Sequence, residues 1–88
     1  MDNQENKLKE VLEIFERRIW KHTGVSMLSG GFASAKVARV NKNAYNIRLK
    51  WGVQDGDVNA VYTDNYKLPK KALDNRNALD IALDIKHV

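Results

Sequence analysis

The 88-residue sequence contains no cysteine and a single proline. Without cysteine the chain forms neither disulfides nor zinc–thiolate sites, so side-chain packing has to stabilise the fold. No apolar run approaches the ~18 residues of a membrane-spanning helix, and the N-terminus lacks the basic-then-apolar order of a signal peptide. We therefore expect a cytoplasmic protein that does not enter a membrane.

Residues suited to catalysis are also scarce. The only histidines, His22 and His87, have no serine or carboxylate at a spacing that suggests a catalytic pair. Asp55-Gly56-Asp57 lacks the further oxygen ligands of a calcium loop, and Ser29-Gly30-Gly31 lacks the Gly-Lys-Ser/Thr ending of a phosphate-binding loop. We expect no enzymatic activity, no cofactor and no metal ion.

The composition is that of one ordinary globular domain. Hydrophobic residues make up 43% of the chain and charged residues 30%, which is typical of a soluble protein with a core and not of a disordered segment. A chain of this length has room for one core, so residues 1–88 are expected to form a single domain. The sequence does not indicate an oligomeric state.

Acidic residues are absent from Thr23 to Trp51. This segment contains five basic residues: Lys36, Arg39, Lys42, Arg48 and Lys50. The rest of the chain contains ten basic and eleven acidic residues, so the formal net charge of +4 comes entirely from this segment. A field of one sign attracts an acidic partner, most often the phosphates of a nucleic acid.

The first part of the chain has the periodicity of an amphipathic helix, from about Asn3 to His22. Its apolar stripe follows the spacing i, i+3, i+4, i+7 and consists of Leu8, Val11, Leu12, Phe15 and Ile19. Cationic residues in the last turn complement the helix dipole, and Gly24 is placed to adopt the left-handed conformation that ends a helix.

The clearest strand pattern runs from Ala44 to Trp51. Its side chains alternate between an apolar and a polar set, which is typical of a half-buried antiparallel strand. The apolar set is Tyr45, Ile47, Leu49 and Trp51, and the polar set is Asn46, Arg48 and Lys50. We expect the apolar set to face the core and the polar set to face solvent.

A neighbouring strand is expected over Ala35–Asn41. It would reach the Ala44–Trp51 strand through a turn at Asn41-Lys42-Asn43, because asparagine tolerates positive φ. Lys36 and Arg39 are three residues apart, so in a regular strand their side chains would point to opposite faces of the sheet. A β-bulge or an edge twist is therefore expected between them.

The second half of the chain adds a hairpin and an ambiguous segment. Asp55-Gly56 is a two-residue hairpin signal and leads into a third strand, Val58–Thr63. Residues 78–86 fit both a strand and a helix, and we favour a helix capped by Asp74, because Leu and Ala prefer helices. The predicted fold is α+β in the order α-β-β-β-α. It has a three-stranded antiparallel sheet and both helices packed on one face.

A second basic cluster, Lys67, Lys70 and Lys71, lies before this last helix. The order α-β-β-β-α, with a Lys-Lys pair opening an Ala/Leu-rich final helix, resembles the layout of the double-stranded-RNA-binding domain. The matching stretch is Pro69-Lys70-Lys71-Ala72 leading to Ala82-Leu83, and the resemblance implies contacts from these lysines to RNA. That family's Gly-Pro-rich loop ending in His has no counterpart here.

Two functions remain from the sequence. The first is a small basic accessory protein that binds DNA or RNA phosphates through a positively charged sheet face. The residues expected to contact the nucleic acid or other partner are Lys36, Arg39, Lys42, Arg48, Lys50, Lys70 and Lys71. The alternative is a protein-interaction module, such as a small phage- or mobile-element-encoded inhibitor or adaptor that binds an acidic surface of a host enzyme.

Overall fold

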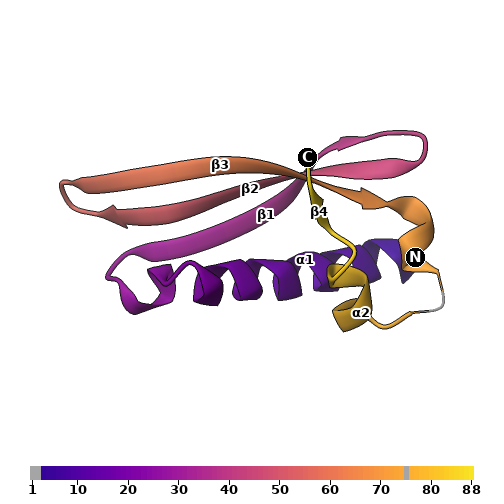
Figure 1. Ribbon diagram of the computed structural model, residues 1–88, viewed down its shortest axis with the longest axis horizontal. Helices are drawn as coiled ribbons and strands as arrows, with labels where there is room; N and C mark the ends of the chain where they lie inside the picture. Colours follow the sequence, from indigo (N-terminus) through magenta and orange to yellow (C-terminus); the bar gives the residue numbers. More distant parts are fainter. Residues whose placement is uncertain (1–2, 75) are drawn as a thin grey trace.

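The computed structural model describes residues 3–74 and 76–88 (Figure 1). The chain begins with α1 (Asn3–His22) and a single 3-10 turn, η1 (Val25–Met27). Three long strands follow: β1 (Gly31–Val40), β2 (Ala44–Asp55) and β3 (Val58–Pro69). A second 3-10 turn, η2 (Lys70–Leu73), a short helix, α2 (Ala78–Ala82), and β4 (Lys86–His87) complete the described part.

The strands form one antiparallel sheet in the order β1-β2-β3-β4. Figure 1 shows α1 and α2 on the same side of this sheet. The α+β class and the placement of both helices on one face are as predicted, but the predicted number of strands is wrong. The described residues form four strands, because the chain returns to the sheet after α2.

Helix α1 has the bounds predicted from its apolar stripe. Val11 and Phe15 are buried, and Leu8, Leu12 and Ile19 pack against the same core. Gly24 has φ of 81°, as expected for the left-handed residue beyond a helix end. The stripe therefore positions α1 against one face of the sheet.

The register of β2 confirms the predicted alternation. Ile47 and Leu49 are buried in the core, whereas Arg48 and Lys50 are exposed. Val37 lies opposite Ile47, yet Arg39 lies opposite Asn46, so β1 has one extra residue between them. This confirms the predicted bulge.

The β2–β3 hairpin is longer than predicted. Asp55 pairs with Val58, so the two-residue loop is Gly56-Asp57, one residue later than expected. Strand β3 continues past the predicted end at Thr63 as far as Pro69, and Leu68 is fully buried beside Tyr45. Asp64 interrupts the apolar alternation in this stretch, but it accepts a hydrogen bond of 3.0 Å from Trp51 Nε1.

The ambiguous C-terminal segment forms a helix and then a strand. The side chain of Asn77 caps α2 by accepting a hydrogen bond from the Asp80 amide, so the predicted cap at Asp74 is wrong. Asn77 is the better cap because Ala78, Ile81 and Ala82 then face the core together. The core that results contains Val11, Phe15, Ala35, Ile47, Leu49, Leu68, Ala72, Leu73, Ala78, Ile81 and Ala82.

Candidate functional site

The candidate site is the face of the sheet that points away from α1, which we call the outer face. Successive residues in a strand point to opposite faces, and residues directly opposite each other in neighbouring strands share a face. The buried residues Ile47 and Leu49 define the inner face, so the register assigns every other strand position to the outer face. Its basic residues are Lys36, Arg39, Arg48, Lys50, Lys67 and Lys86.

The bulge in β1 decides the composition of this face. In a regular strand Lys36 and Arg39 would lie on opposite faces. The extra residue, Ala38, places Arg39 opposite Asn46 and thereby on the same face as Lys36. The bulge therefore adds a fourth cation to the two from β2 and the one from β1.

The cations of the outer face have no acidic neighbours among the described strand residues. Lys36 lies directly opposite Arg48, and Lys67 lies directly opposite Lys86. The ion pairs within residues 3–74 and 76–88 join Arg76 to Asp84 and His87 to Asp64, so neither involves this face. Like charges placed directly opposite one another destabilise a sheet. The outer face thus keeps a positive charge that opposes folding slightly.

A shallow hollow of about 260 Å³ lies in the middle of this surface. Lys36, Arg48 and Lys50 line it together with Ser34 and the bulge residues Val37 and Ala38. Three cationic residues and one hydroxyl-bearing residue therefore line a small recess. Such an arrangement suits an anionic group that accepts several hydrogen bonds, such as a phosphate.

The second predicted cluster lies at the β1–β2 turn. Lys42, Lys70 and Lys71 line one hollow there, and the Lys70 amide donates a 2.9 Å hydrogen bond to the Asn43 carbonyl oxygen. Lys67 of the outer face lines an adjacent hollow with Lys42 and Lys71. The two clusters are therefore continuous around Lys67.

This arrangement corrects one expectation. Lys70 and Lys71 belong to η2 and do not open the last helix, which begins eight residues after Lys70 at Ala78. Because α2 has only five residues, the layout of the double-stranded-RNA-binding domain, with its lysine pair at the mouth of a final helix, is not reproduced.

Most aromatic side chains lie away from the outer face. Four of them lie at inner-face positions of the strands: Tyr45, Trp51, Tyr62 and Tyr66. Trp51 stacks on Tyr62 with ring centroids 4.8 Å apart, and Tyr45 lies 5.6 Å below the Lys70 ammonium group. Among the described strand residues, Phe32 is the one aromatic residue at an outer-face position. The outer face therefore offers charge and not a row of stacking rings.

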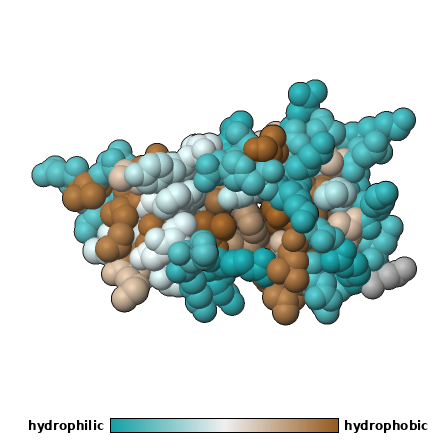
Figure 2. All heavy atoms as spheres, viewed as in Figure 1, coloured by the Kyte–Doolittle hydropathy of each residue, from teal (hydrophilic) through white to brown (hydrophobic). Residues whose placement is uncertain are grey.

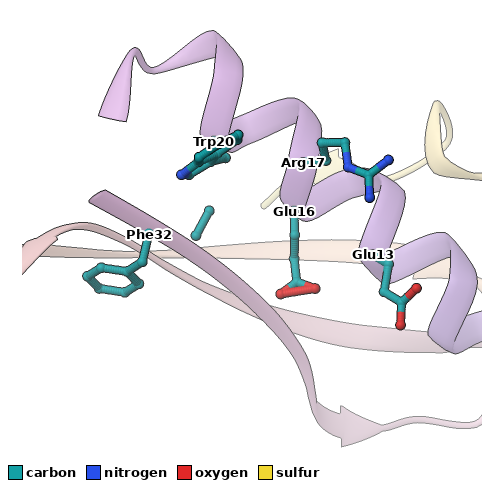
Figure 3. Close-up of a pocket in the computed structure, with 6 residues that line it drawn as sticks. Glu13, Glu16, Arg17, Trp20 and Phe32 are labelled. Atoms are coloured by element: carbon teal, nitrogen blue, oxygen red, sulfur yellow. The ribbon is translucent and has the colours of Figure 1, made fainter. Parts of the chain in front are cut away.

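A different hollow lies between α1 and β1 (Figure 3). Glu13, Glu16 and Trp20 of α1 point toward β1 there, and Glu16 already accepts a 3.1 Å hydrogen bond from the Ala35 amide. Within the described residues there is no group of three or more His, Cys, Asp or Glu side chains that could hold a metal ion. None of the described helices is long and apolar enough to cross a membrane.

The hydropathy of the surface agrees with the position of the basic residues at the β1–β2 turn. Figure 2 shows mainly hydrophilic residues over the end of the molecule that contains the β1–β2 turn, at the right of the view. Hydrophobic residues are visible next to the hydrophilic tip of the β2–β3 hairpin, at the left, and in the middle of the view. The basic cluster at the β1–β2 turn therefore lies in a mainly hydrophilic part of this view.

All seven residues predicted from the sequence are at least partly exposed, and the structure divides them between two groups. Lys36, Arg39, Arg48 and Lys50 lie on the outer face, and Lys42, Lys70 and Lys71 lie at the β1–β2 turn. Sequence reasoning did not place Lys67 and Lys86 on the sheet. The alternation of Tyr66 and Leu68 around Lys67 could have predicted that Lys67 lies on a strand. Lys86 could not be placed without strand β4, which the sequence did not predict.

No protein-family model, no curated protein and no solved structure matches this chain.

Proposed function

We propose that the protein binds the phosphate backbone of a nucleic acid through the outer face of its sheet. The single observation that carries the proposal is the set of six cations on this face, with no carboxylate at an outer-face position of the described strands to neutralise them. A solubilising surface usually intersperses charges of both signs. Here the sheet places two pairs of cations directly opposite each other, at a small loss of stability.

Duplex is the form of nucleic acid that this face fits best. Proteins that bind single strands combine a basic groove with aromatic side chains on which the bases stack. The outer face lacks that row of rings, because four of the aromatic residues have inner-face parity. Contacts to phosphates alone fix a protein on a duplex without reading its sequence, so binding is expected to depend little on sequence.

The test is a titration of labelled duplex DNA, duplex RNA and single strands at several salt concentrations. Three to five phosphate contacts correspond to a log–log salt slope of roughly −3 to −5 on duplex. Non-specific binders reach dissociation constants of about 10⁻⁴ to 10⁻⁶ M at physiological salt. Failure to bind any of these probes more tightly than about 100 μM at about 50 mM salt contradicts the proposal.

A matched pair of triple variants separates the face from net charge. Arg39→Glu, Arg48→Glu and Lys50→Glu together change the outer face, while Lys9→Glu, Arg17→Glu and Lys21→Glu change exposed positions of α1. Each set replaces three cations and takes the formal net charge from +4 to −2. The first set should abolish binding, and the second should leave most of it.

The alternative, an acidic protein surface as partner, uses the same cations. Such an interface also weakens with salt, so the salt slope alone does not separate the two functions. The duplex titration does separate them. If the folded protein binds none of the nucleic-acid probes, the outer face is assigned to an acidic protein partner.

A further inference from the structure

The two edges of the sheet differ in how they are protected. At the β1 edge, the Ala35 amide donates to Glu16 Oε2, and Trp20 Nε1 donates to the Gly31 carbonyl oxygen at 3.4 Å. Figure 3 shows Glu16 and Trp20 reaching from α1 toward this strand. Helix side chains and the bulge therefore occupy the β1 edge, which hinders pairing with another strand.

The opposite edge belongs to β3 and is covered only at one end. Strand β4 pairs with Tyr66 and Lys67, and the Val88 amide donates a 3.0 Å hydrogen bond to the Asn65 carbonyl oxygen. From residue 58 to residue 64, no described strand lies beside this edge. The tip of the β2–β3 hairpin extends beyond α1 in Figure 1.

The direction of the free backbone groups follows from the Asn65 contact. Because its carbonyl oxygen faces β4, every second residue before it points its N–H and C=O groups toward the same edge. Those residues are Asn59, Val61 and Thr63. The intervening residues pair with β2 instead.

The exposed edge has the chemistry of a pairing strand. Its sequence from Val58 to Thr63 is VNAVYT, without charge, proline or glycine. All six residues are exposed, and Val58, Val61 and Tyr62 retain 58%, 40% and 55% of their accessible surface. Proteins protect free edges with lysine, proline or a bulge, and none of these occurs between residues 58 and 63. A long, uncharged, apolar edge is a template for another strand.

We propose that this edge pairs with the same edge of a second copy of the chain, as antiparallel strands related by a two-fold axis at Val61. Asn59, Val61 and Thr63, whose backbone groups point toward the free edge, are evenly spaced around Val61. Asn59 therefore lies opposite Thr63 of the partner subunit, and Val61 lies opposite Val61 of the partner subunit. A two-fold interface has to be self-complementary in this way. With no charge from residue 58 to residue 63, the pairing brings no like charges into contact across the strands.

The length of the free edge agrees with this register. Pairing centred on Val61 uses residues 58–64 and ends before Asn65, whose carbonyl oxygen already accepts a hydrogen bond from the Val88 amide. Asp64, the one charged residue of this stretch, then lies opposite Val58 of the partner subunit. The paired stretch is therefore the whole part of the β3 edge that β4 leaves uncovered.

A two-fold axis perpendicular to the sheet keeps both outer faces on the same side. The dimer would be one continuous eight-stranded sheet with two basic faces side by side. This arrangement does not depend on the proposed function, because the edge pairs through uncharged residues and needs no nucleic acid.

The test is sedimentation velocity and equilibrium from about 1 to 500 μM, without nucleic acid. A single strand pair buries little surface, so we expect a reversible dimer whose population rises over this range. Val61→Lys places two like charges opposite each other at the two-fold axis and should weaken dimerisation about tenfold or more. The control, Gln54→Lys, adds the same charge to an exposed outer-face position of β2, away from the free edge, and should leave the dimer intact.

Two further variants keep the test decisive. Val61→Glu should also be monomeric, and an equimolar mixture with Val61→Lys should restore the dimer, because opposite charges then meet at the axis. Asn59→Pro removes an N–H group that points toward the free edge, without breaking a hydrogen bond to β2. It should prevent dimerisation, and it replaces Val61→Lys as the test if the lysine impairs folding. A wild-type protein that stays monomeric to 500 μM, or a Val61→Lys dimer of undiminished affinity, overturns the proposal.

Discussion

Lys36 and Arg48 lie directly opposite each other in β1 and β2, both exposed on the outer face. Neither takes part in an ion pair among the described residues. A cross-strand pair of like charges destabilises a sheet by a few tenths of a kcal/mol to about 1 kcal/mol. Retaining such a pair is expected where the charge serves binding, since stability and function then make opposite demands.

The first prediction is that Lys36→Glu stabilises the fold and weakens nucleic-acid binding. The change replaces repulsion from Arg48 by attraction, which should raise the free energy of unfolding by about 0.2–1 kcal/mol. The measurement is chemical denaturation together with a duplex titration.

Lys50→Glu is its matched control. Lys50 lies opposite Ser34 and Thr63, so it has no directly opposing cation to relieve. Lys50→Glu should therefore weaken binding similarly without the gain in stability. Equal changes in the free energy of unfolding of the two variants would show that repulsion between Lys36 and Arg48 does not lower the stability of the fold.

The second prediction concerns the bulge at Ala38. Deleting this residue joins Val37, opposite Ile47, directly to Arg39, opposite Asn46, so the regular alternation is restored and every pair is kept. The free energy of unfolding should change by less than about 1 kcal/mol, and binding should persist. Deleting Ala35 instead shifts the preceding residues by one position and turns them to the wrong face, so it should be strongly destabilising. Denaturation of both deletions measures the difference.

The sequence predicted those features that depend on local periodicity. The apolar stripe from Leu8 to Ile19 defined α1, and the alternation from Tyr45 to Trp51 defined the buried face of β2. The opposite parity of Lys36 and Arg39 indicated the bulge. These features each follow from a period of 3.6 or 2 in a few neighbouring residues.

The features that the sequence did not predict depend on contacts between distant residues. Asp64 occupies an inner-face position of β3 because Trp51 Nε1 donates to it and His87 Nε2 lies 3.8 Å away. Without those partners a carboxylate there argues against a strand. Lys86 joins the outer face only because the chain turns back to pair with β3 after α2.

The third prediction tests the attachment of α1 to the sheet. Phe15 is buried, and its ring meets Tyr66 edge-on with centroids 4.9 Å apart. Phe15→Ala should lower the free energy of unfolding by about 3–5 kcal/mol. Leu79, at 58% exposure on α2, is the control, and Leu79→Ala should lower it by less than about 1 kcal/mol. A loss below about 1 kcal/mol for Phe15→Ala would mean that α1 is not anchored through this ring.

The fourth prediction uses the same aromatic contact and concerns alkaline pH. Burial, with the negative charge of Asp64 as a smaller cause, raises the pKa of Tyr66 above its ordinary value of 10.0. The folded state therefore holds the phenol proton more tightly than the unfolded state does. The resulting stability is fully present below pH 10 and is lost as the pH rises through the raised pKa.

Tyr66→Phe removes this titration and keeps the ring against Phe15. The free energy of unfolding should therefore fall less steeply between about pH 9 and 11 in Tyr66→Phe than in the wild type. Every other titrating group is present in both proteins, so the difference between the two curves reports Tyr66. Parallel curves for Tyr66→Phe and the wild type would show that the Tyr66 phenol has the same proton affinity in the folded and the unfolded chain.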